Sequence, residues 1–182
     1  MQPSPSGLRW RNTPPPALTI CQKNWLMRPG ALTAALRQLG ALDLRVLSEK
    51  VRPLTREDSS LIGLAVGQPA WVREVAMRLG GQDCVVARSL TPLGPSHGVW
   101  QGIRRLRTRP LADMLYQDAS IHRSDFEVAR LGRRSALFQT VQRNLTKPVT
   151  HTLLARRSVF WRSGQPLLVA ECFLPEFWRQ AQ

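Results

Sequence analysis

Lysine, cysteine and acidic residues are scarce in this chain of 182 residues, and each scarcity narrows what the protein can be. Acidic residues number 12 against 26 lysines and arginines, which leaves a formal net charge of +14. No apolar run approaches the roughly 20 residues that a transmembrane helix requires, so we expect no stable membrane insertion. Arg9 and Arg11 are followed by no continuous apolar segment, so we also expect no secretory signal.

The three cysteines are an odd number without close spacing, which predicts neither a disulfide framework nor a zinc site. They fit a reducing cytoplasm, where we expect the protein to act. The histidines at positions 97, 122 and 151 also lack the spacing of metal ligands, and the sequence has no Gly-rich phosphate loop of either standard pattern. We therefore expect no metal site.

The basic excess is almost entirely arginine, because lysine occurs only at positions 23, 50 and 147. Such a charge indicates an anionic partner, such as a nucleic acid, a membrane surface or a small polyanion, or else reflects genome composition. The basic residues do not alternate with aromatic residues, as platforms for stacked bases require, so we expect no nucleic-acid partner.

The length of the chain and its hydrophobic content of 43% suit one domain with a sizeable core. Prolines at positions 3, 5, 14, 15 and 16 predict a flexible N-terminal arm, which we assign to residues 1–23. The domain is then expected over residues 24–182.

Local patterns predict several elements within the domain. An apolar stripe with helical spacing predicts an amphipathic helix within residues 25–39, ended by Gly40. Alternating residues predict strands over residues 42–51 and 121–131. The other expected elements are a short helix capped by Asp58 or Ser59, a helix that begins at Pro110, and a basic surface excursion over residues 132–150.

Two β-hairpins are the clearest elements. Residues 71–79 and 83–90 flank Gly80-Gly81, and a second pair of strands between residues 156 and 175 flanks Ser163-Gly164. Glycine tolerates the positive φ that such turns need. Hairpins separated by helices, with no βαβ rhythm, predict an antiparallel α+β domain.

Three charged residues, Arg73, Arg88 and Glu171, stand alone in otherwise apolar rows of these strands. One interpretation is structural: a buried ion pair, or arginine stems that pack while their charged ends reach the sheet edge. The other is an enclosed site for an anion that also presents a hydroxyl or ether oxygen. Arginine binds a carboxylate bidentately, and a buried glutamate can donate a proton.

Four stretches of the chain carry a resemblance to a known family. They are Trp71-Val72-Arg73-Glu74-Val75, Ala87-Arg88-Ser89-Leu90-Thr91-Pro92, Arg156-Arg157-Ser158 and Glu171-Cys172-Phe173-Leu174-Pro175. In these stretches the chain resembles the bacterial chorismate lyases, which form 4-hydroxybenzoate at the head of ubiquinone biosynthesis. The resemblance covers about residues 24–175, and residues 1–23 and 134–150 depart from it.

The resemblance implies a single antiparallel six-stranded sheet, with helices packed against it and helical flaps over a buried ligand. By position, Arg73 holds the ring carboxylate and Glu171 reaches the opposite oxygen. There it is expected to hydrogen-bond the ether oxygen, either as a general acid or only as a hydrogen-bond partner. Leu111 and Leu32 supply flap contacts. Arg88 is expected to meet the enolpyruvyl carboxylate.

The implied reaction is the elimination of pyruvate from chorismate to leave 4-hydroxybenzoate, which is a carbon–oxygen lyase reaction. Aromatisation of the ring drives it, so we expect no metal and no redox cofactor. We expect a cytoplasmic monomer that hands its product transiently to a membrane prenyltransferase.

One alternative stays open at this point. The same pocket could sense or carry an aromatic acid without catalysis, as effector-binding domains of some bacterial transcription regulators resemble this fold. Such regulators carry a helix-turn-helix ahead of the domain, for which the Pro-rich residues 1–23 are expected to have no room.

Overall fold

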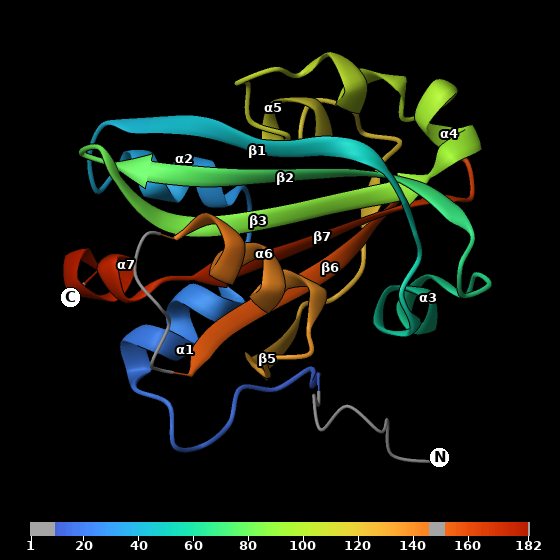
Figure 1. The fold of residues 1–182 in the computed structure, drawn as a ribbon. Helices are drawn as coiled ribbons and strands as arrows, with labels where there is room; N and C mark the ends of the chain where they lie inside the picture. The colour runs from blue at the N-terminus through green and yellow to red at the C-terminus, as the bar shows by residue number, and fades with distance from the viewer. Residues whose placement is uncertain (1–9, 146–151, 182) are drawn as a thin grey trace.

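Two long hairpins form the middle of the sheet in the computed structural model, which describes residues 10–145 and 152–181 (Figure 1). The first joins β2 (Pro69–Leu79) to β3 (Gln82–Pro92), and the second joins β6 (Leu153–Arg162) to β7 (Gln165–Phe173). Strands β3 and β7 pair antiparallel, so the two hairpins become one surface. The two hairpins and the α+β class predicted from the sequence are confirmed.

Three further strands lie at the two edges of the sheet. Strand β1 (Leu42–Pro53) pairs with β2 at one edge, and at the other edge β4 (His122–Arg123) and β5 (Glu127–Leu131) both pair with β6. The order is β1-β2-β3-β7-β6-β4, with β5 also on β6, so seven strands occupy six positions. The predicted single strand over residues 121–131 is therefore interrupted, which adds one strand to the expected six.

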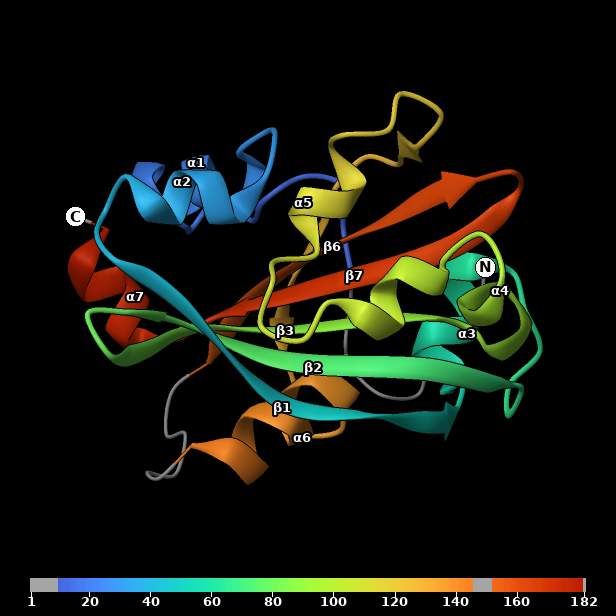
Figure 2. The ribbon, with the colours of Figure 1, turned by 90° about the horizontal axis from the view of Figure 1, so that it is seen from above.

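Helices cover both ends of one face of the sheet (Figure 2). At one end lie α1 (Ile20–Met27) and α2 (Leu32–Arg37), and α7 (Pro175–Gln180) packs its Phe177 with them in the same apolar cluster. The other end is covered by α4 (Leu93–His97), the 3-10 helix η1 (Gln101–Arg105) and α5 (Ala112–Leu115). The space between these two groups is the site described below.

The opposite face carries α3 (Arg56–Ile62) and α6 (Ala136–Asn144). The prediction of a surface excursion over residues 132–150 is wrong for its described part, because Leu137, Phe138 and Val141 of α6 are buried against the sheet. Residues 146–150 of that prediction lie outside the described residues. Thr55, rather than Asp58 or Ser59, is the N-cap of α3.

The N-terminal region differs from its prediction in two ways. The single helix expected within residues 25–39 is two helices, because Pro29 and Gly30, the latter with φ of +79°, separate α1 from α2. In the described part of the predicted arm, Trp10 donates to Glu57 at 3.0 Å and Arg11 bridges to Val128. Trp10, Arg11 and the buried Leu18 of this segment therefore contact the rest of the domain, while several residues between them are exposed.

Within the ranges that the structure describes, no helix has the length and apolar character to cross a membrane.

Candidate active site

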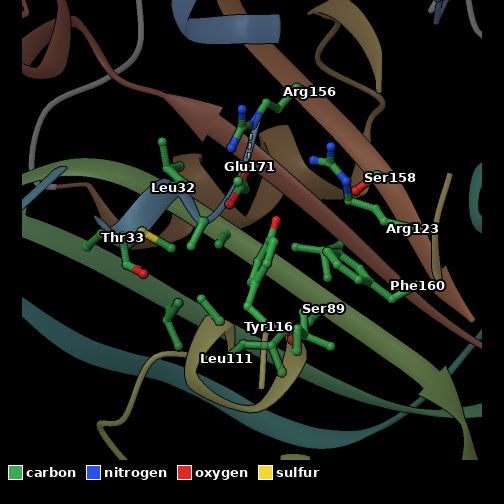
Figure 3. A pocket seen from close by; sticks show the side chains of 18 of the residues that line it. Leu32, Thr33, Ser89, Leu111, Tyr116, Arg123, Arg156, Ser158, Phe160 and Glu171 are labelled. Atoms are coloured by element: carbon green, nitrogen blue, oxygen red, sulfur yellow. Dashed lines mark hydrogen bonds and ion pairs between the residues drawn. The ribbon is translucent and has the colours of Figure 1, made fainter. Parts of the chain in front are cut away.

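A pocket lies on the sheet face that carries α2 and α5 (Figure 3). It holds about 610 Å³ of space free of protein atoms, part of which is open to solvent. Its floor comes from the strands β2, β3, β7 and β6, and its cover comes from residues 30–33 and from residues around α5. The pocket therefore depends on segments that lie far apart in the sequence.

Alternation along the strands decides which side chains reach this pocket. Strand β2 contributes Arg73 and Val75, and strand β7 contributes Val169 and Glu171. Because successive side chains of a strand point to opposite faces, the residue between the first two, Glu74, points to the other face of the sheet. There Glu74 accepts a hydrogen bond from Thr140 of α6 at 2.6 Å. Arg73 and Glu74 are adjacent in the sequence, but their side chains therefore lie on opposite faces of the sheet.

Glu171 is held at one wall of the pocket by Arg156, its direct partner across the β6–β7 hairpin. Arg156 Nε donates to Glu171 Oε2 at 2.6 Å, and the side chains are 2% and 12% exposed. Among the described lining residues Glu171 is the one acidic side chain.

Arg156 also ties the pocket cover to the sheet. Its Nη1 donates to the backbone carbonyls of Trp25 at 3.3 Å and Arg28 at 3.0 Å, where α1 ends. Its guanidinium lies 4.3 Å from the ring centroid of Phe126. One buried arginine therefore fixes Glu171 and the corner between α1 and α2 together.

Arg73 is buried on the β2 side of the pocket with its side chain 2% exposed. Its Nε donates to Glu49 of β1 at 2.9 Å, and its Nη2 donates to the carbonyls of Arg107 at 2.7 Å and Arg109 at 3.3 Å. Burial lowers the pKa of Arg73, and Glu49 opposes that shift. Arg73 Nη1 has no hydrogen-bond partner among the described residues. This one group can therefore donate to a ligand, whereas a bidentate contact through two nitrogens was expected from the sequence.

Arg123 and Tyr116 contribute polar groups to the remaining wall. Figure 3 shows the Tyr116 hydroxyl pointing into the pocket toward Glu171, with Arg123 beside Ser158 and Phe160. Burial raises the pKa of Tyr116, and the Glu171 carboxylate raises it further, while Arg123 and Arg156 act in the opposite direction. The phenol is therefore neutral at physiological pH.

The prediction that places Arg88 in the site is wrong. Arg88 points to the opposite face of the sheet, where it donates to the two carboxylate oxygens of Asp58 at 2.8 and 3.2 Å. Glu74 lies 3.8 Å from it on the same side. The structural interpretation of a buried ion pair therefore applies to Arg88.

The structure brings the other four predicted residues to one pocket: Arg73, Glu171, Leu32 and Leu111. Sequence reasoning missed Arg156, although the signal was available. Arg156 shares its strand face with apolar residues, and a two-residue turn at Ser163-Gly164 places it opposite Glu171. Among the described residues no group of three His, Cys, Asp or Glu side chains is arranged to hold a metal ion.

Comparison with known proteins gives matches over nearly the whole chain. The family model described as "Chorismate lyase" matches residues 9–182. A probable chorismate pyruvate-lyase of Bordetella pertussis is 54% identical over 181 residues, covering 99% of this chain and 95% of that protein. Probable chorismate pyruvate-lyase 1 of Pseudomonas fluorescens is 38% identical over 173 residues, covering 95% of this chain and 92% of that protein.

Among solved structures, a GntR-family transcriptional regulator from Bacillus cereus matches with a TM-score of 0.54. It is 10% identical, and the match covers 74% of this chain and 92% of that chain. At that identity the likeness concerns the fold alone.

Proposed function

This chain belongs to the chorismate lyase family, and from that premise we propose that it eliminates pyruvate from chorismate to give 4-hydroxybenzoate. The observation that carries the proposal is a single pocket with an arginine and a glutamate on opposite sides of its sheet floor. Chorismate presents a ring carboxylate at one end and a hydroxyl at the other, which suits this pair.

The sheet register sets the spacing of the two side chains. Arg73 is opposite Ser89, and Ser89 is opposite Val169, which lies two residues from Glu171 on β7. Two interstrand steps and two residues along a strand separate the Cα atoms of Arg73 and Glu171 by about 12 Å. Both side chains point into the pocket, so one six-membered ring fits between their polar ends.

Each residue then has a defined part in the reaction. The ring proton leaves from the carbon that bears the hydroxyl group, and the bond from the adjacent carbon to the ether oxygen breaks. The proton that leaves the ring balances the one that converts the departing enolpyruvate to pyruvate. Arg73 Nη1 holds the ring carboxylate, while Leu32 and Leu111 pack on the ring.

Glu171 is assigned to the ring hydroxyl. The expected role as a proton donor to the ether oxygen fits poorly with the Arg156 contact, in which Glu171 Oε2 is already a hydrogen-bond acceptor at 2.6 Å. A carboxylate accepts the hydrogen bond of the hydroxyl and stabilises the electron density that this oxygen gains as the ring becomes aromatic. The proposed reaction therefore uses Glu171 as an acceptor.

The location, the oligomeric state and the pathway of the enzyme are proposed from the family alone. We place the enzyme in the cytoplasm as a monomer, with 4-hydroxybenzoate passed to a membrane prenyltransferase for ubiquinone biosynthesis. The proposal uses no metal and no redox cofactor, because aromatisation supplies the driving force.

The test is turnover of chorismate by the purified chain, with 4-hydroxybenzoate and pyruvate quantified by chromatography. We expect equimolar products above the spontaneous rate, loss of most of that activity in Arg73→Met, and retention in Arg78→Met, which removes an arginine from the same strand outside the pocket. Tight binding of 4-hydroxybenzoate without turnover would contradict the lyase proposal and favour a sensor or carrier.

A further inference from the structure

Three arginines line the pocket, and two of them are paired with carboxylates. Arg73 lies 2.9 Å from Glu49, and Arg156 lies 2.6 Å from Glu171. The third, Arg123, forms no ion pair with any carboxylate in the described ranges, and it faces the same space. The pocket therefore carries one positive charge that the described residues do not balance.

Arg123 is held in place by its neighbours, and one nitrogen of its guanidinium stays without an acceptor among the described residues. It belongs to the edge strand β4, opposite Phe160 of β6, and its guanidinium lies 3.9 Å from the ring centroid of Phe126. Its Nη1 is buried and has no hydrogen-bond partner in the part of the chain that the structure describes. A buried donor without an acceptor is costly, so this nitrogen marks a place for an anionic ligand group.

The chemistry of the substrate supplies such a group. Chorismate carries a second carboxylate on its enolpyruvyl side chain, and Arg88, the residue expected to bind it, lies on the other face of the sheet with Asp58. Figure 3 places Arg123 against the wall made by Ser158 and Phe160, whereas Leu32 and Thr33 lie across the pocket from it.

We propose that Arg123 binds the carboxylate of the enolpyruvyl side chain and thereby distinguishes chorismate from 4-hydroxybenzoate. This inference rests on the proposed lyase function and extends it. The aromatic product has lost the group that Arg123 recognises, so Arg123 strengthens binding of the substrate without strengthening retention of that product. A planar fork stacked on Phe126 suits carboxylate recognition better than a lysine would.

The experiment compares Arg123→Met with wild type and with Arg130→Met, an exposed arginine on β5 that removes the same charge outside the pocket. Methionine keeps an apolar stem against Phe126, and thermal melting checks that the variant is folded. Two constants are measured for each protein: kcat/KM for chorismate and Kd for 4-hydroxybenzoate by calorimetry. A third ligand, 4-hydroxybenzoate with a carboxymethoxy group beside the hydroxyl, mimics the dianion without reacting.

For Arg123→Met we expect kcat/KM to fall about 10- to 100-fold, the size of a lost charge-assisted hydrogen bond, while the Kd of 4-hydroxybenzoate stays within about threefold. The dicarboxylate should lose affinity by the same factor as kcat/KM. Arg123→Lys should recover part of the loss, and Arg130→Met should match wild type.

Equal losses for substrate, dicarboxylate and product in Arg123→Met would overturn the inference, because a general disturbance of the pocket would then explain them. An unchanged kcat/KM would overturn it as well. Failure of wild type to turn over chorismate is a different result, which refutes the proposed function itself.

Discussion

Replacement of Arg88 by methionine separates a structural role from a role in binding. Arg88 and Asp58 are 5% and 3% exposed, and two hydrogen bonds of 2.8 and 3.2 Å join them. In Arg88→Met the carboxylate of Asp58 stays buried without its partner, and Glu74 loses a neighbouring positive charge. Breaking a buried pair from one side costs about 3–5 kcal/mol.

The expected loss of stability is large enough to measure in two ways. For a chain of this length it corresponds to a fall in Tm of about 6–20 °C. Urea unfolding followed by tryptophan fluorescence gives the free energy directly. The double variant Arg88→Met/Asp58→Asn should recover most of the loss, because it removes the unpaired charge while the asparagine oxygen can still accept from the Thr55 backbone.

The same variant should leave substrate recognition intact. Measured at a temperature where Arg88→Met is folded, KM for chorismate and Kd for 4-hydroxybenzoate should both match wild type. The reasoning is refuted if stability is unchanged while KM for chorismate rises tenfold or more, because Arg88 would then contact the substrate after all.

Three further predictions concern single side chains. Glu171→Gln should lower kcat about 10- to 100-fold, since the charge of the acceptor is lost, while 4-hydroxybenzoate still binds in calorimetry; an unchanged kcat removes Glu171 from the chemistry. Burial raises the pKa of Tyr116, so the ratio of kcat/KM between wild type and Tyr116→Phe should stay constant from about pH 6 to 9; a change in that ratio shows that the phenol ionises. Burial also raises the pKa of Glu57 above its ordinary value of 4.5, so its stabilising contribution is present at low pH and lost as the pH rises through the folded pKa. Glu57→Gln, which can still accept from Trp10, should therefore raise Tm at pH 7 but not below pH 4.5, and an equal gain at both would contradict this.

The turn geometry of the two hairpins predicts one part of the site correctly and another part incorrectly. A two-residue turn at Ser163-Gly164 places Arg156 opposite Glu171, and the structure keeps that register along the whole β6–β7 pair. The sequence therefore held enough information to find this pair. A two-residue turn at Gly80-Gly81 would likewise place Arg73 opposite Arg88, with both side chains on the same face of the sheet.

An irregularity in the first hairpin breaks that expected register. The register shifts between Met77 and Arg78, so Arg73 is opposite Ser89 and Arg88 is opposite Glu74. A shift of one residue moves every side chain beyond it to the other face. Neither residue composition nor alternation indicates such a bulge, which is why Arg88 could not be placed correctly from the sequence.

The helices were harder to predict for a different reason. The segment that contains α6 is rich in arginine, and its charge indicated a surface position, yet Leu137, Phe138 and Val141 form a buried stripe on one side of it. The break between α1 and α2 follows from Pro29 and Gly30, which the apolar spacing on both sides concealed. Tertiary packing therefore decided the position of α6, whereas local backbone preference decided the break between α1 and α2.

The central claim is that one ligand ring lies between Arg73 and Glu171. A crystal structure of the chain with 4-hydroxybenzoate tests it most directly. We predict the ligand carboxylate within hydrogen-bond distance of Arg73 Nη1 and the ligand hydroxyl on the Glu171 carboxylate, with Arg156 still paired to Glu171. A reversed ligand, with its carboxylate at Arg156, or a ligand bound outside this pocket would contradict the account.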